Sequence, residues 1–299
     1  MKTRIAAIGL IAFSGTIWAA PDLNDSFNGL KAAVEAKDPA KVKTLAPQTS
    51  QEARKIVAEP QPSDANAVAD WKARVEFAKG ADKYSEYALS TAATQASDPN
   101  LTIELVNQLL AQSPKSQYLD ECASVYLTAL SKESPDKALA GATKIAAAVP
   151  DNEDALLIMA SSNNAGAANR LVNAVRAKKK PEGVSEADWD KRKNYMLGQG
   201  LFYAGVGQCS AKNPGWADCD RDLRAALPLI APQQTGAAYF YLGLANYQLG
   251  KLTQDRSKIQ QGIKYSDQAA GMPGPMQAQA ARNSQGMKAD LAAPAGRGR

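Results

Sequence analysis

From Trp71 onward, apolar residues recur at helical spacing, and this part of the chain lacks the alternating Val-, Ile-, Tyr- and Thr-rich runs of β-strands. Short helix-breaking clusters divide the pattern at intervals of about one helix, and several of them pair Pro with Asp, Ser or Asn. Such a polar residue caps the following helix, and Pro fits the first helical turn. This spacing predicts antiparallel pairs of helices. The clusters are residues 97–100, 113–115, 134–136, 150–152, 181–183 and 232–234.

The spacing of these clusters predicts five helical pairs and one closing helix. The first helices of the pairs are expected near residues 82–96, 118–132, 153–165, 188–206 and 236–250. The second helices are expected near residues 100–112, 136–148, 167–179, 218–231 and 255–270. The closing helix, near 276–291, is expected to cover the last pair, because a terminal repeat has no neighbour on its outer side. The residues expected to be buried by it are Met276, Ala280, Met287 and Leu291.

Shorter helices are predicted before Trp71. Phe27 and Leu30 recur at helical spacing in a first helix, which Asp38 and Pro39 are expected to end. A second short helix is expected to stop at Pro47, and residues 53–58 predict a third. The pattern therefore predicts a small helical region at the N-terminal end.

The first residues have the pattern of a secretory signal peptide. Lys2 and Arg4 precede an apolar run from Ile5 to Ala20, which small residues close. We expect cleavage after Ala19. The alternative is an uncleaved anchor, but the run is shorter than the ~20 residues that span a bilayer. The mature protein is therefore expected to be periplasmic or secreted, without stable insertion into a membrane.

These patterns divide the chain into four parts. Residues 1–19 are the signal peptide, and residues 20–69 are the N-terminal helical region with a linker at its end. The linker, residues 59–64, contains two prolines that favour extended backbone. A repeat domain over residues 70–275 follows, and residues 276–299 form the capping helix and a tail that we expect to be disordered from Ala292 onward.

Two partial motifs recur within the repeat domain. One is present as Thr102-x3-Val106-x2-Leu109-x4-Pro114 and as Ala138-x3-Ala142-x2-Ile145-x4-Pro150. The other is present as Asn194-x2-Leu197-Gly198-x2-Leu201 and as Tyr239-x2-Leu242-Gly243-x2-Asn246. In these motifs the chain resembles the tetratricopeptide repeat (TPR) family, whose unit is a helix-turn-helix of ~34 residues. Glycine beside leucine lets the two helices of a pair approach closely, so Gly198 and Gly243 are expected at such contacts.

The resemblance implies an all-α, right-handed solenoid of TPR-like helix-turn-helix repeats, with ligands bound in a concave groove lined by the first helices. Aromatic rings suit peptide recognition, because they provide large, rigid contact area. The peptide-binding residues that the resemblance implies are Tyr84, Tyr87, Asn164, Tyr195, Gln199, Phe202, Tyr247 and Gln248. Neighbouring positions are Thr91, Leu127, Asn163, Tyr203, Phe240 and Leu244.

Within this set, one cluster is the preferred binding surface: Tyr195, Phe202, Tyr247 and Gln248. The alternative for each aromatic residue is a place in the hydrophobic core, where most aromatic residues at helical spacing lie.

Composition narrows the possible chemistry. The chain has no histidine, which excludes Ser-His-Asp and Cys-His catalysis and any metal site with histidine ligands. Its three cysteines are too few for a four-thiolate metal site. The formal charge of +5 is small for 299 residues and does not favour nucleic-acid binding. Cys209 and Cys219 flank an inserted loop. The sequence is compatible both with a disulfide between them and with two unpaired thiols.

The sequence therefore predicts a non-enzymatic, exported scaffold that binds a protein or peptide and needs no cofactor and no metal. One alternative is a helical enzyme that cleaves cell-wall glycan with two carboxylates facing one cleft. Another is a module that assembles with itself. Neither the identity of the partner nor the oligomeric state follows from the sequence.

Overall fold

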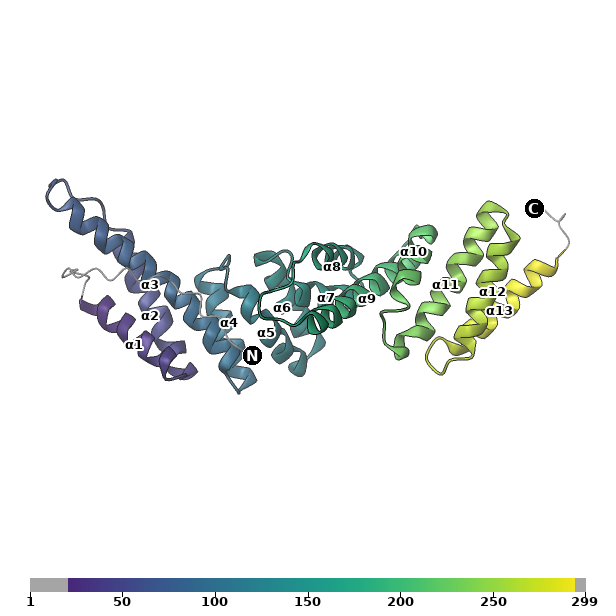
Figure 1. Ribbon diagram of the computed structural model, residues 1–299, viewed down its shortest axis with the longest axis horizontal. Helices are drawn as coiled ribbons and strands as arrows, with labels where there is room; N and C mark the ends of the chain where they lie inside the picture. The colour runs from purple at the N-terminus through teal and green to yellow at the C-terminus, as the bar shows by residue number, and fades with distance from the viewer. Residues whose placement is uncertain (1–20, 294–299) are drawn as a thin grey trace. The chain divides into compact units, whose positions relative to one another are not determined.

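The computed structural model describes residues 21–293, which fold into thirteen α-helices and contain no β-strand (Figure 1). The signal peptide expected at residues 1–19 and the end of the expected disordered tail lie outside this range. The helices are α1 (Pro21–Glu35), α2 (Pro39–Val57), α3 (Val68–Gln95), α4 (Pro99–Gln112), α5 (Leu119–Glu133), α6 (Pro135–Ala148), α7 (Glu153–Ser161), α8 (Ala165–Ala177), α9 (Glu186–Ser210), α10 (Trp216–Ala226), α11 (Pro232–Thr253), α12 (Arg256–Ala270) and α13 (Gln277–Ala292).

These bounds confirm the all-α prediction and the existence of all eleven helices expected from residue 82 onward, α3 to α13. The largest difference is α3, which begins fourteen residues earlier than expected, at Val68. No helix among the described residues is long and apolar enough to cross a membrane.

Capping residues explain where the helices begin. Asp98 accepts a hydrogen bond from the Asn100 N–H at 2.9 Å, and Pro99 occupies the first helical turn of α4. Ser134 caps α6 in the same way and is also followed by Pro. Each cap satisfies an N–H group that has no partner within the helix. The polar-residue–Pro pairs at Asp98 and Ser134 therefore mark helix starts, as predicted, whereas Ser113 and Pro114 lie before α5 without capping it.

The prediction that a helix ends at Pro47 is wrong, because α2 continues through this residue to Val57. An interior proline removes one backbone hydrogen bond and costs about 3 kcal/mol. However, α2 buries Val42 and Ala46 before Pro47 and Ala53 and Ile56 after it. Full burial of one aliphatic side chain contributes roughly 1.5–3 kcal/mol, so the continuous apolar face outweighs the proline.

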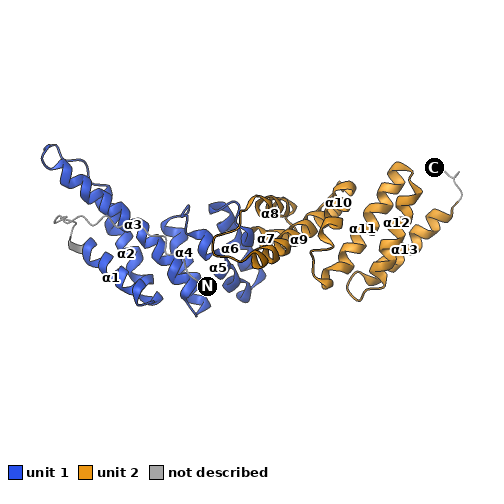
Figure 2. Ribbon diagram, viewed as in Figure 1, with its two compact units in different colours: residues 1–155 blue, residues 156–299 orange. Residues whose placement is uncertain are grey.

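The described residues divide into two compact units, residues 1–155 and residues 156–299 (Figure 2). In unit 1, each helix from α1 to α6 contacts the next one, and α3 also contacts both α1 and α5. Helix α2 likewise contacts α4. Alternate helices are therefore neighbours in unit 1, as expected when helical pairs stack on one another.

The N-terminal helices share a core with α3. Leu23 of α1, Ile56 of α2 and Ala78 of α3 belong to one buried cluster, against which Phe27 and Phe77 pack. The linker at residues 59–64 thus connects two segments that lie against each other.

In unit 2 the alternation involves α9, α11 and α13 but not the described helices between them. Helices α8 to α13 contact their successors, and α11 also contacts α9 and α13. Figure 1 shows α11, α12 and α13 side by side. Helix α13 buries Ala280 and Met287, which confirms the expected closing helix, whereas Met276 and Leu291 are only half-buried.

Glycines set the spacing of the helices in unit 2. A Cβ atom added to Gly262 of α12 would lie 2.9 Å from the Gly243 carbonyl oxygen of α11. One added to Gly198 would lie 2.7 Å from the Leu229 carbonyl oxygen, just after α10. The contact at Gly243 confirms a close approach of two helices, whereas Gly198 of α9 lies against the segment between α10 and α11.

The end of α9 is tied to α10 by a disulfide between Cys209 and Cys219, whose Cα atoms are 5.5 Å apart. Of the two states that the sequence left open, the structure has the bonded one. The third cysteine, Cys122, is a buried thiol.

Candidate functional site

Two of the three α9 residues that are expected to bind a peptide are buried within the protein. Phe202 is 8 % exposed and belongs to the main core of unit 2. Gln199 is 6 % exposed, and its side-chain amide exchanges two hydrogen bonds with that of Gln234, at 2.8 and 2.9 Å. Tyr195 is different, since 52 % of it is exposed.

On α11, Tyr247 is held by the closing helix. Its hydroxyl donates to a carboxylate oxygen of Asp290, and the Lys251 ammonium lies 5.3 Å from the centre of its ring. Burial is the main cause that raises the pKa of Tyr247, and Asp290 adds to it. Gln248 is half-buried on the same helix.

Asn164 has a capping role. Its side chain accepts a hydrogen bond from the Ala167 N–H at 3.0 Å and so begins α8. Asn163, just before it, is exposed with a φ of +65°, which Asn tolerates better than most residues. Both asparagines are therefore explained by the turn from α7 to α8.

The preferred cluster in unit 2 is thus not a single exposed surface. Phe202 is in the core, Tyr247 is tied to α13, and Tyr195 alone of the cluster is mostly exposed. Leu127 and Phe240 are also buried, whereas Thr91, Tyr203 and Leu244 are half-buried.

Tyr84 and Tyr87 belong to a larger arrangement in unit 1, which we call the aromatic row. It consists of Phe77, Phe27, Tyr84, Tyr87 and Tyr118, in that order. The centres of successive rings are 5.5, 5.4, 5.7 and 5.8 Å apart, within the range of favourable aromatic pairs. Three of the rings come from α3, one comes from α1, and the last belongs to the residue before α5.

The rings of the row are only partly withdrawn from solvent. Phe27, Phe77, Tyr84 and Tyr87 are half-buried, and Tyr118 is buried. Burial, with smaller contributions from Tyr87 and Glu35, raises the pKa of Tyr84 to about 12. The tyrosine hydroxyl therefore stays protonated at neutral pH and can both donate and accept a hydrogen bond.

Gly80 lies between Phe77 and Tyr84 along α3. Residues 77, 80, 84 and 87 are three or four positions apart, so they share one face of α3. A Cβ atom added to Gly80 would meet nothing within 4 Å. Helix packing therefore does not require glycine at this position. In an exposed helix, glycine lowers stability by about 1 kcal/mol relative to alanine.

The sequence reasoning found Tyr84 and Tyr87 but missed the rest of the row. The spacing of Phe77 and Gly80 relative to Tyr84 was a usable signal. Phe27 was placed on an N-terminal helix without a link to α3, because only the tertiary structure brings α1 to that face. Tyr118 also joins the row through folding alone.

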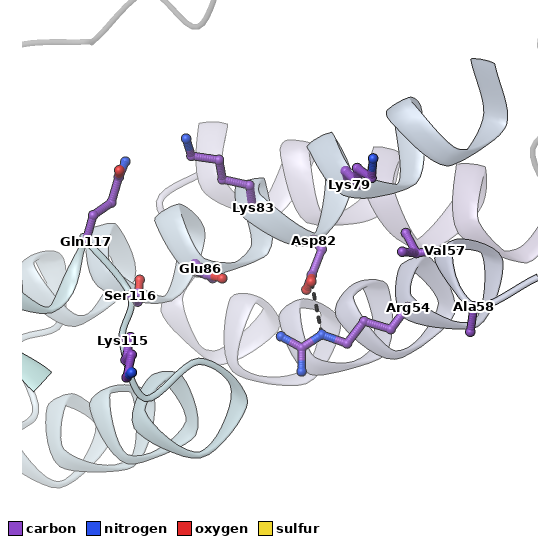
Figure 3. A pocket seen from close by; sticks show the side chains of 10 residues that line it. All are labelled: Arg54, Val57, Ala58, Lys79, Asp82, Lys83, Glu86, Lys115, Ser116 and Gln117. Carbon is purple, nitrogen blue, oxygen red and sulfur yellow. Dashed lines mark hydrogen bonds and ion pairs between the residues drawn. The ribbon is translucent and has the colours of Figure 1, made fainter. Parts of the chain in front are cut away.

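A cavity of about 560 Å³ lies in unit 1 where α2, α3 and the loop before α5 meet (Figure 3). We call it the basic cavity, because four basic side chains and two acidic ones line it. Its lining residues are Arg54, Val57, Ala58, Lys79, Asp82, Lys83, Glu86, Lys115, Ser116 and Gln117.

Both acidic residues of the basic cavity are engaged within the protein. Figure 3 shows Asp82 pointing toward the Arg54 guanidinium, whose Nε lies 3.0 Å from its carboxylate. The Ser50 hydroxyl donates to the same carboxylate at 2.6 Å, and the Ser113 hydroxyl donates to Glu86 at 2.6 Å. The acidic groups thus hold α2, α3 and α4 together.

The described residues provide neither a metal-binding cluster nor a reactive free thiol. They contain no group of three or more Cys, Asp or Glu side chains that could hold a metal ion. Burial raises the pKa of the Cys122 thiol to about 11, which keeps it protonated and unreactive at neutral pH.

Comparisons with known proteins give no relative: no family model, no curated protein sequence and no solved structure matches the chain significantly.

Proposed function

We propose that the chain is a non-enzymatic, exported scaffold that binds a protein or peptide on the aromatic row of unit 1. We further propose that its helical pairs are TPR-like repeats forming a right-handed solenoid. The alternating helix contacts within each unit support the repeats. The disulfide supports export, because such bonds persist in oxidising compartments.

The observation that carries the proposal is a line of five neighbouring rings, with an exposed glycine, Gly80, on the α3 face that carries three of them. Tyrosine is suited to recognition, since its rigid ring loses little entropy and its hydroxyl can bind a peptide group. The open space at Gly80 lets a ligand backbone approach α3 closely.

The expected binding free energy limits the affinity that the aromatic row can provide by itself. If a ligand covers a further ~50 Å² of each ring, the transfer free energy is about 1.2 kcal/mol per ring. Tyr118 is already buried, so the four half-buried rings contribute roughly 5 kcal/mol, which is close to the cost of association itself. We therefore expect the row to act together with polar contacts beside it.

The test is selection of a random twelve-residue peptide library, displayed on phage, against the purified mature protein. We expect enriched peptides, and we expect their affinity, measured by fluorescence anisotropy, to fall about tenfold or more in a Tyr84→Ala, Tyr87→Ala double variant. Gly80→Gln should also weaken binding, because its side chain covers the row without disturbing the core.

Two controls locate the site. Tyr84→Phe keeps the ring and should bind nearly normally, and Tyr195→Ala changes the exposed tyrosine of unit 2 and should have no effect. The opposite pattern, with loss only in Tyr195→Ala, places the binding surface in unit 2 and contradicts the proposal. Turnover of cell-wall glycan by the purified protein also contradicts it.

A further inference from the structure

Two carboxylates lie beside the tyrosines of the aromatic row. Burial is the main cause that raises the pKa of Tyr84, and the charge of Glu35, on α1, adds to it. Burial likewise raises the pKa of Tyr118, and the charge of Glu121, on α5, adds to it. Each carboxylate is therefore close enough to a tyrosine hydroxyl of the row to act on it through space.

Neither of these carboxylates has a cationic partner. Glu35 and Glu121 are exposed and form no ion pair with another described residue. Partial burial and the charge of Asp120 raise the pKa of the Glu121 carboxyl, so its charged form is less favourable than in water. Asp120 accepts a hydrogen bond from the Asn152 amide at 2.7 Å, which leaves its own charge in place. Lys83 of α3 lines the basic cavity instead. A bound cation would therefore stabilise the charged form of Glu121.

The rings of the row are themselves suited to a cation. The face of an aromatic ring is negative, so an ammonium or guanidinium group within about 6 Å of the ring centre is stabilised. The row already contains one such contact, because the Lys31 ammonium lies 5.7 Å from the centre of the Phe27 ring. Among the described residues, no lysine or arginine lies in this way over Tyr84, Tyr87 or Tyr118. We call these three tyrosines the tyrosine half of the row.

Resting on the proposed function, we propose that the tyrosine half of the aromatic row binds lysine or arginine side chains of the peptide partner. One cationic group rests against Tyr87 and Tyr118 with Glu121 as its counter-ion, and Glu35 serves a second one at Tyr84. The two phenylalanines of the row, which already hold a lysine of the chain, contact apolar residues of the peptide. The partner is therefore a basic segment that also carries apolar residues.

Selection from the peptide library described above tests this preference. Every displayed peptide has the same free N-terminus, so enrichment of Lys or Arg reports side chains. We expect peptides selected on the wild-type protein to contain Lys or Arg together with apolar residues. Selection on a Glu35→Gln, Glu121→Gln variant should lose the basic enrichment, because glutamine keeps the shape of the side chain and removes its charge.

The matched control is an Asp151→Asn, Asp190→Asn variant. It makes the same change in net charge at two exposed residues outside the row, neither of which pairs with another described residue. We expect it to select the same basic peptides as the wild-type protein. Circular dichroism should show the same helix content for both variants.

Affinity measurements with a selected peptide sharpen the test. Norleucine in place of lysine, or citrulline in place of arginine, keeps most of the side chain and removes the charge. We expect about tenfold weaker binding when either the peptide or the two glutamates are changed in this way. Changing both should weaken binding little further, because each change removes the same interaction. Binding of the unchanged peptide should also weaken as salt is added.

Three results overturn the inference while leaving the proposed function intact. They are enrichment of peptides without Lys or Arg, equal basic enrichment on the Glu35 and Glu121 variant, and losses of affinity that simply add. Equal loss in the matched control shows a general charge effect and also overturns the inference. Absence of any enrichment on the wild-type protein contradicts the proposed function and this inference with it.

Discussion

At the scale of single residues, glycines inside helices have two opposite roles. Gly262 lies where α12 meets α11, and an added Cβ would come within 2.8 Å of the Tyr247 nitrogen and 2.9 Å of the Gly243 oxygen. These are backbone atoms of a packed helix, which cannot move away cheaply. At Gly80 the same Cβ would meet open space. The first glycine is needed for packing and the second is not.

Alanine substitutions should therefore change stability in opposite directions. We expect Gly80→Ala to stabilise the protein by about 0.5–1 kcal/mol through helix propensity. We expect Gly262→Ala to destabilise it by about 1–3 kcal/mol through overpacking. Thermal unfolding followed by circular dichroism measures both, with shifts of roughly 2–4 °C per kcal/mol for a unit of this size. Equal shifts of the same sign would show that the two sites do not differ in packing.

At the scale of elements, the boundary between α9 and α10 depends on a covalent bond as well as on packing. The disulfide joins Cys209, near the end of α9, to Cys219, in the first turns of α10. It closes a loop that the Gly215 N–H also supports, by donating to the Gln208 carbonyl oxygen at 3.2 Å. Closing a loop of this length lowers the entropy of the unfolded chain and so stabilises the fold.

Removal of this bond should lower stability without changing the helices. In the loop-entropy relation, a closed loop of about ten residues contributes roughly 2.5 kcal/mol. We expect a Cys209→Ser, Cys219→Ser variant to melt at a lower temperature than the oxidised protein and to be insensitive to reductant. Thiol titration of the denatured, oxidised protein should find one thiol, that of Cys122. Three titrating thiols would contradict the bond.

At the scale of the whole molecule, the proposed export of the chain is consistent with the oxidation of Cys209 and Cys219 to a disulfide. In the proposed function, the signal peptide expected at residues 1–19 would deliver the chain to a compartment where Cys209 and Cys219 can form their disulfide. In both units consecutive helices pack against each other, and some alternate helices also touch.

The prediction at this scale concerns the mature chain. We expect intact-mass analysis of the exported protein to show a chain that begins at Ala20, with two fewer hydrogen atoms than the reduced form. A version lacking residues 2–19 should stay in the cytoplasm with both cysteines reduced. A full-length mass in the membrane fraction would instead indicate an uncleaved anchor.

The sequence by itself determined the local structure. Polar residues followed by proline, as at Asp98 and Ser134, end one helix and begin the next through hydrogen bonds within a few residues. The Leu-Gly pair at Gly243 could also be interpreted locally, because close helix approach requires a missing side chain.

Only the tertiary structure decided which aromatic residues remain accessible and which acidic groups are already paired. Phe202 and Tyr84 have similar helical patterns in the sequence, yet Phe202 is in the core and Tyr84 is half-exposed. Pro47 stays within α2 for the same reason, since burial on both sides of it depends on distant helices. The aromatic row and the basic cavity combine side chains from separate helices, and no spacing along one helix can predict such contacts.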